Sequence, residues 1–156
     1  MKDRSLSVSK YLLVAFSIIG LFAMTYLALS FGASIIPQNS CSIASTVIDC
    51  GKVVTSQYSE LFLGIGNYYL GIVFFAVLLV LSSIMVISPD KRRLNDSFTY
   101  VVLVFAAFGA ILSVYLIYLE LFVLDAICLL CTLGHIAIFS ILIISLLLIY
   151  ERRKDL

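Results

Sequence analysis

Residues 126–150 read AICLLCTLGHIAIFSILIISLLLIY, a continuous apolar run whose one possible cationic side chain is His135. A helix needs about 20 mostly apolar residues to cross the hydrocarbon core of a membrane. The length of the run and its low charge therefore predict a membrane-spanning helix. Cys128 and Cys131, which form a CxxC pair, lie with His135 near its start.

Three other runs meet the same criterion: residues 11–36 and 61–88 carry no charge, and residues 98–124 carry only Glu120. The chain is 63% hydrophobic and its mean hydropathy is +1.17, which is more apolar than a soluble domain requires. Long continuous runs favour helices over alternating barrel strands. We expect an all-α integral membrane protein with one domain over residues 1–156, a bundle of four transmembrane helices with a capping outer loop.

Lysine and arginine are distributed unevenly between the two sides that this topology creates. Nine of the ten lie before the first span, between the second and third, or after the fourth, and Lys52 falls in the outer loop. The positive-inside rule makes the basic side cytoplasmic, together with both termini. We expect a multi-pass protein of the cell membrane, or of the ER membrane in a eukaryote. The basic clusters are short and lie against the spans, which argues against nucleic-acid binding.

All four cysteines fall on the exoplasmic side of this topology, where disulfides persist. Cys41 and Cys50 lie in the first outer loop, and Cys128 and Cys131 lie at the outer mouth of the fourth span. Four interpretations are open: two structural disulfides, a four-cysteine zinc site, inert cysteines, or a relay that exchanges disulfides. A CxxC disulfide closes a very short loop and adds little stability, and C-x₈-C only half matches a zinc pattern. We favour the relay and expect no metal.

The start of the fourth span has the features of a reactive site. Asp125 is a candidate N-cap, and Cys128 and Cys131 then share a face of the first turns, with His135 one turn deeper. The positive end of a helix favours a thiolate. Glu120 and Asp125 lie near the outer rim, where they could tune the thiol pKa unfavourably or feed protons, but we expect them to be solvated helix ends.

The outer loop contains a second periodic pattern. Val54, Tyr58, Leu61 and Phe62 repeat at helical spacing. This pattern predicts a short amphipathic helix that lies on the mouth of the bundle and carries Cys50 toward Cys128.

Taken together, these residues resemble the vitamin K epoxide reductase family of membrane thiol oxidoreductases. The resemblance covers nearly the whole chain and rests on Cys41, on CGKVVTSQYS at residues 50–59, on NYYLG at 67–71 and on CLLCTLGH at 128–135. A separate group of bacterial disulfide-forming quinone reductases, distinct from this family, also has four spans and four cysteines. Its CxxC, however, lies in the first outer loop. The order found here favours the vitamin K epoxide reductase relatives.

The resemblance implies a four-helix bundle around a quinone, such as menaquinone, ubiquinone or a related one. Cys128 and Cys131 match the catalytic CxxC, with Cys131 facing the quinone ring and Cys128 exchanging with Cys50. Cys41 would meet the thiols of a thioredoxin-like periplasmic or extracellular partner. Disulfide formation in exported proteins would be the net result.

Three further positions match residues near the quinone in this family. Asn67 matches an asparagine that hydrogen-bonds a quinone carbonyl, and Ser56 matches a loop serine near the active site. His135 stands where some relatives carry tyrosine, also a quinone contact. Each has a structural alternative: polar side chains inside spans often bond only to neighbouring helices.

Rival functions remain at this point. The same scaffold could run as a vitamin K quinone or epoxide reductase, although histidine in place of tyrosine puts the epoxide in doubt. A non-catalytic tetraspan adhesion or assembly protein would use the disulfides only to pin its loop. A thiol-based sensor would bind no quinone.

Overall fold

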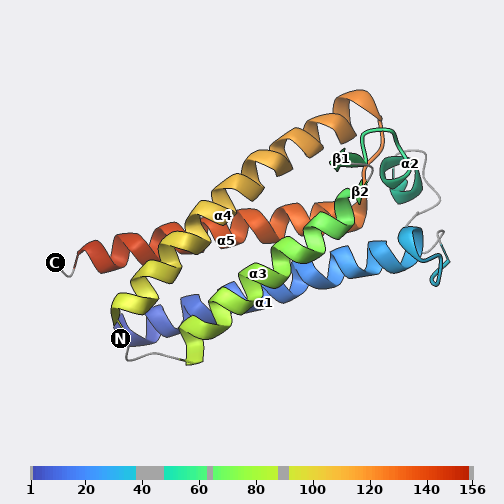
Figure 1. Cartoon of the computed structure of the whole chain (residues 1–156). Helices are drawn as coiled ribbons and strands as arrows, with labels where there is room; N and C mark the ends of the chain where they lie inside the picture. The colour runs from blue at the N-terminus through green and yellow to red at the C-terminus, as the bar shows by residue number, and fades with distance from the viewer. Residues whose placement is uncertain (1, 38–47, 63–64, 88–91, 155–156) are drawn as a thin grey trace.

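The computed structural model describes residues 2–37, 48–62, 65–87 and 92–154, and in these ranges four long helices form a bundle (Figure 1). They are α1 (Lys2–Leu27), α3 (Asn67–Ile87), α4 (Arg92–Tyr118) and α5 (Leu129–Arg153). Each is long and apolar enough to cross a membrane. The predicted all-α membrane fold with four spans is confirmed.

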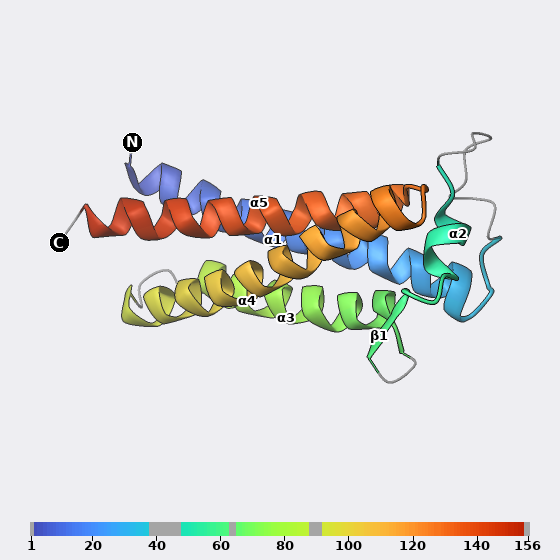
Figure 2. The ribbon, with the colours of Figure 1, turned by 90° about the horizontal axis from the view of Figure 1, so that it is seen from above.

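The four helices form a closed ring in which each one contacts two neighbours. The contacts run from α1 to α3, from α3 to α4, from α4 to α5 and from α5 back to α1. Seen from above, α5 and α1 make one layer and α4 and α3 the other (Figure 2). The two ends of the chain lie at one end of the bundle, and the short helix α2 (Cys50–Val54) lies at the other.

The second span begins later than the sequence predicted. Residues Glu60–Phe62 form strand β1, which pairs antiparallel with strand β2 (Ile65–Gly66), so the prediction of a helix from residue 61 is wrong. Gly64 and Gly66 explain the difference, because glycine costs about 1 kcal/mol in a helix interior relative to alanine. The helix starts only at Asn67, after the hairpin.

The predicted amphipathic lid helix is only partly present. Helix α2 is a short segment that begins at Cys50, and Asp49 caps it by accepting a hydrogen bond from the Lys52 N–H at 3.1 Å. Beyond Val54 the chain turns, so Tyr58 is not helical, and Leu61 and Phe62 belong to strand β1. Local hydrogen bonds, such as Ser59 N–H to the Ser56 carbonyl at 3.0 Å, replace the helical ones.

Two spans end in π-helical turns near the capped end of the bundle. Helix α1 continues into η1 (Ala28–Gly32) and α4 continues into η3 (Leu119–Val123). In η3 the N–H of Leu124 donates to the Leu119 carbonyl at 2.9 Å, five residues back. Such turns rotate side chains away from the ordinary helical register and are frequent at functional sites.

The fourth span begins at Leu129, with Cys128 in the capping position before it. The prediction that Asp125 caps this helix is wrong. Asp125 has a left-handed backbone with φ of 46° and belongs to the connection from η3, three residues too early to cap the helix.

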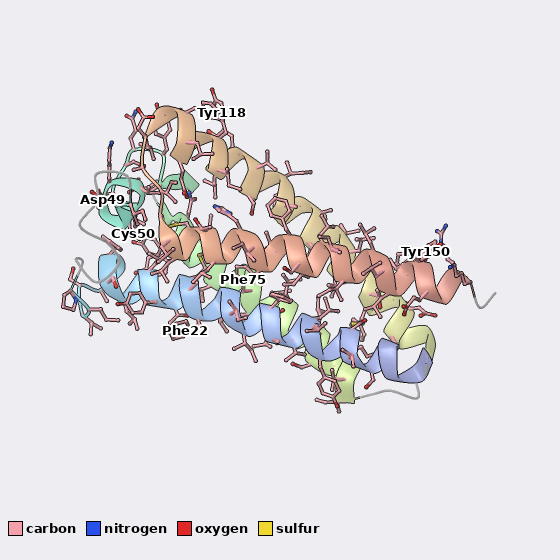
Figure 3. All side chains as sticks on the ribbon, turned by 180° about the vertical axis from the view of Figure 1, so that it is seen from behind. Phe22, Asp49, Cys50, Phe75, Tyr118 and Tyr150 are labelled. Atoms are coloured by element: carbon pink, nitrogen blue, oxygen red, sulfur yellow. A yellow bond between two sulfur atoms is a disulfide. The ribbon has the colours of Figure 1, made fainter. Side chains whose placement is uncertain are left out.

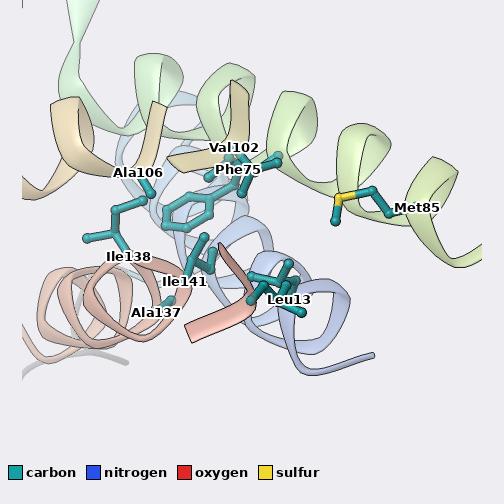
Figure 4. Packing of buried hydrophobic residues seen from close by; sticks show 10 residues of the cluster. Leu13, Phe75, Met85, Val102, Ala106, Ala137, Ile138 and Ile141 are labelled. Carbon is teal, nitrogen blue, oxygen red and sulfur yellow. The ribbon is translucent and has the colours of Figure 1, made fainter. Parts of the chain in front are cut away.

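The centre of the bundle is filled by apolar side chains from all four spans. Figure 4 shows the Phe75 ring of α3 among Ala106 of α4 and Ile138 and Ile141 of α5, all of them buried. Gly20 of α1 lies against the same ring, because a Cβ at that position would overlap it. Small residues of this kind let spanning helices approach closely.

Hydroxyl groups in the bundle are largely satisfied within their own helices. Ser17, Ser82 and Ser145 each donate to the carbonyl four residues earlier, at 2.7–2.8 Å. Thr99 does the same toward Asn95. In a medium without water, an unpaired polar group costs several kcal/mol. The bundle centre is therefore suited to a membrane.

Replacing Gly20 with valine should destabilise the bundle, because the new side chain collides with the Phe75 ring. Overpacking of this kind costs about 1–3 kcal/mol. We expect a lower apparent Tm in detergent, measured by loss of helical circular dichroism. The control is Ile18→Val, which places the same side chain on the exposed face of α1. Equal Tm values for Gly20→Val and the control would contradict this packing.

Candidate redox site

The CxxC pair forms the first turn of α5 and is joined by a disulfide, with Cα atoms 5.1 Å apart. Cys128 is fully buried, and its sulfur accepts a hydrogen bond from the Cys131 N–H at 3.2 Å. The Cys128 carbonyl accepts from both the N–H and the hydroxyl of Thr132, each at 2.9 Å. The pair therefore sits at the positive end of the helix dipole, which favours a thiolate once the disulfide opens.

Cys50 is brought to this turn by a backbone connection between the cap and the segment before α5. Ile48 and Ile127 form an isolated parallel bridge, and the N–H of Asp49 donates to the Ile127 carbonyl at 3.2 Å. Cys50 and Cys128 are both fully buried and belong to one cluster. Figure 3 shows Cys50 and Asp49 at the end of the bundle opposite Tyr150.

The disulfide state of the cysteines is partly described. Cys50 is disulfide-bonded, as are Cys128 and Cys131. Cys41, the fourth predicted catalytic residue, lies outside the described residues, and its role stays a prediction.

A cavity lies directly beneath the cap, between α1, the segment 53–59, the start of α3, the end of α4 and α5. Its volume is about 90 Å³, it opens outward on one side, and most of its wall is apolar. Cys131 lines it, and so do Ser56, Asn67 and His135. The structure thus gathers these four sequence-predicted residues, from three separate segments, around one cavity.

Asn67 is the first residue of α3 and is anchored to the cap. Its backbone N–H donates to the Ser59 carbonyl at 2.8 Å, and its side-chain N–H group donates to the Tyr58 carbonyl at 3.4 Å. Ser56 donates its hydroxyl proton to the Val53 carbonyl at 2.8 Å. Both side chains are held by the cap itself, so the cavity depends on how the cap folds.

His135 lies one turn deeper in α5 than Cys131 and is only 7% exposed. Its Nε2 atom has no hydrogen-bond partner among the described residues. The nearest charged group is Glu120, whose Oε1 lies 3.7 Å from Nε2. A buried polar atom without a bond is costly unless a ligand or water satisfies it.

Glu120 is the residue whose burial the sequence did not predict. We expected a solvated helix end, but the side chain is only 6% exposed, so that expectation is wrong. Its Oε2 atom accepts the N–H of Cys128 at 3.3 Å. The signal was available, because a lone acid within an apolar span marks a functional site by default. The nearby Asp125 made both acids look like parts of an exposed loop.

The cavity fits a quinone by its chemistry. It combines a mostly apolar wall with a few polar groups, which is typical of sites for hydrophobic ligands. The unbonded Nε2 of His135 and the side chain of Asn67 are suited to quinone oxygens. Among the described residues, no group of three or more His, Cys, Asp or Glu could hold a metal ion.

Two comparisons with known proteins gave different results. A search of curated proteins found no match. The family model described as the vitamin K epoxide reductase family matches residues 11–146, which is most of the chain. Members of this family are membrane oxidoreductases that use quinones. The chain belongs to the vitamin K epoxide reductase family.

Proposed function

We propose that this protein passes electrons from a thioredoxin-like partner, through Cys41 and Cys50, to Cys128 and Cys131 and then to a quinone. The observation that carries the proposal is the shared position of the two cysteine regions. Cys50 and Cys128 pack in one buried cluster, while Cys131 of the same CxxC lines the apolar cavity. One sulfur pair thus reaches both a loop cysteine and a site for a lipid-soluble ligand. The result would be disulfide formation in exported proteins.

The proposed orientation places the cap on the exoplasmic side. The two ends of the chain lie at the opposite end of the bundle, and nine of the ten Lys and Arg residues fall on that side in the topology that the sequence predicts. That excess of positive charge favours the cytoplasm. The cysteines would then face an oxidising compartment in which thiol partners and exported substrates are found.

Electron entry is a series of thiol–disulfide exchanges. A thiolate of the partner attacks Cys41 in a Cys41–Cys50 disulfide, forms a mixed disulfide there and releases the Cys50 thiolate. Cys50 attacks Cys128, which breaks the Cys128–Cys131 bond and frees the Cys131 thiolate. The second thiol of the partner then resolves the mixed disulfide, and the partner leaves oxidised. Each step depends on the attacking thiolate and on the leaving sulfur.

The loop pair is then restored by internal exchange. The freed Cys41 attacks Cys50 in the Cys50–Cys128 bond, which re-forms the loop disulfide and leaves Cys128 and Cys131 both reduced. These two sulfurs now hold the two electrons that the partner lost. Re-forming their bond releases the electrons at Cys131, on the cavity wall.

Quinone bound in the cavity supplies an acceptor for two electrons and two protons. Asn67 and His135 would hold its oxygens, and Cys131 lies on the same wall to deliver the electrons. The side-chain N–H group of Asn67 is a fixed donor, whereas the imidazole of His135 can also release a proton. The apolar wall would limit the access of water to the reacting groups.

The proposed orientation can be tested with single introduced cysteines. Lys52→Cys in the cap should react with a membrane-impermeant maleimide in intact cells, and Lys154→Cys should react only after lysis. Both native side chains are exposed, so access to the reagent depends on the side of the membrane. Labelling is read by a mass shift on gels, and the opposite pattern would overturn the orientation.

Replacing Cys131 with serine should abolish quinone reduction and trap the relay. Without Cys131 there is no CxxC disulfide, but the Cys128 thiolate can attack Cys50 in the Cys41–Cys50 disulfide, which forms a Cys50–Cys128 bond and releases the Cys41 thiolate. No Cys131 thiolate is then present to deliver electrons to the cavity. We expect quinol formation at background level, and a Cys50–Cys128 peptide in non-reducing mass spectrometry. Ser140→Ala, an exposed change on the same helix, should leave both readouts unchanged. An adhesion or assembly protein would give no quinol in the wild type, and full activity of Cys131→Ser would refute the relay.

Asn67→Leu should weaken the quinone site without stopping thiol exchange. Loss of one hydrogen bond to a quinone oxygen should raise KM for quinone roughly tenfold, about 1.4 kcal/mol. The rate at which the partner is oxidised in a single turnover without quinone should not change. The matched control is Gln57→Leu, an exposed amide of the cap that does not line this cavity. Equal KM values in the two variants would show that Asn67 does not contact the quinone.

Assays with quinone epoxide in place of quinone would show whether the chain is instead an epoxide reductase.

A further inference from the structure

We propose that Glu120 relays a proton to His135 during quinone reduction, so that it acts as a positioning and proton-relay residue behind the imidazole. This inference rests on the proposed function, because it concerns the same cavity. Two observations carry it: a buried carboxylate that reaches both the CxxC turn and the imidazole, and an imidazole nitrogen without a hydrogen bond.

The two oxygens of the Glu120 carboxylate have different neighbours. Oε2 accepts the backbone N–H of Cys128 at 3.3 Å, which links the end of the third span to the redox turn. Oε1 lies 3.7 Å from Nε2 of His135. The contact with Cys128 explains why the side chain is held in place, but it requires only one oxygen. The second oxygen is left facing the imidazole.

The backbone around Glu120 fixes this placement. Glu120 lies in the π-helical turn η3, and its carbonyl accepts the N–H of Ala126 at 3.1 Å. The carboxylate is therefore held at both its main chain and its side chain. A fixed carboxylate next to an imidazole can set which ring nitrogen carries the proton.

Other ionisable groups that line the cavity are Tyr58, Tyr68 and Cys131. Among the described lining residues there is no lysine or arginine, and Glu120 is the only carboxylate. Cys131 exchanges electrons in the proposed reaction, and Glu120 is the lining residue whose side chain is described within 3.7 Å of Nε2 of His135. Glu120 is therefore the group best suited to exchange a proton with His135.

The proton step balances as follows. The His135 imidazolium gives the proton on Nε2 to a quinone oxygen as the Cys128–Cys131 bond re-forms, and it becomes a neutral imidazole. The Glu120 carboxylate then takes a proton from water at the cavity mouth and passes it from Oε1 to Nε2, which restores the imidazolium and the carboxylate. The relay delivers one of the two protons that the quinone consumes, and no bond other than those to hydrogen changes at either residue.

The test is Glu120→Gln, which keeps the size of the side chain and an oxygen to accept the Cys128 N–H. It cannot exchange a proton. We expect kcat for quinone reduction to fall roughly 100-fold, as for loss of a general acid–base group, while KM for quinone stays near the wild-type value. Trapping of the Cys50–Cys128 intermediate in the Cys131→Ser background should be unaffected, which shows that the fold and the thiol chemistry survive.

A second readout needs no quinone. His135 is the only histidine in the chain, so ¹⁵N NMR of imidazole-labelled protein in detergent reports its tautomer and protonation directly. Glu120→Gln should change these resonances across the pH range. The matched control, Glu60→Gln at an exposed glutamate of β1, should leave them as in the wild type.

The outcomes separate the two proposals. Unchanged kcat or unchanged imidazole resonances in Glu120→Gln would overturn the relay while leaving quinone reduction by the wild type intact. If the wild type reduces no quinone, the proposed function fails and the relay into a quinone fails with it, whereas the NMR comparison still decides whether Glu120 governs the state of His135. A lower kcat together with altered resonances supports the relay.

Discussion

The short backbone connection between the cap and the start of α5 is the constraint on which the site depends. Ile48 bridges Ile127, and Asp49 donates to the Ile127 carbonyl, one residue before Cys128. The cap also packs on the bundle through Cys50 and Val54, which join Leu27 in one buried cluster. With the backbone connection in place, Cys50 is buried beside Cys128, and the segment after Cys50 closes over the cavity. A few hydrogen bonds thus place both the sulfur chemistry and the roof of the ligand site.

The bundle below this connection shows where polar groups are tolerated. Ser17, Ser82 and Ser145 satisfy their hydroxyls within their own helices, as a medium without water requires. His135 breaks this pattern, because its Nε2 is buried and unbonded within the described part of the chain. Such a cost is tolerated where a ligand compensates for it. The Ser30 hydroxyl is also buried and unbonded within the described residues, but Nε2 of His135 lies on the wall of the cavity that also holds Cys131, which links the energetics of the bundle to the candidate site.

The sequence predicted the spans well and their ends poorly. Apolar length is a strong signal in a membrane protein, because every backbone group must be bonded internally. The predicted start of the second span was wrong, because an apolar run from residue 61 is compatible with either a strand or a helix. Only the glycines at 64 and 66 indicate that the helix does not begin there. Cys131, His135, Asn67 and Ser56 were found by spacing and by family resemblance, and they do gather at one cavity. The burial of Glu120 was not predicted, because its partners, the N–H of Cys128 and the imidazole of His135, come from a distant part of the chain.

The position of the CxxC at the very start of a helix connects these features. Cys128 occupies the capping position, where its sulfur accepts the N–H of Cys131 in place of the usual serine or aspartate oxygen. The capping group is then also the redox group, so opening the disulfide releases charge where unpaired N–H groups already favour it. The N–H of Cys128 itself is taken by Glu120. The carboxylate is therefore anchored at the helix end that would stabilise the thiolates, and the proposed electron path and the proposed proton path would both lie at the start of α5, with His135 one turn deeper than Cys131.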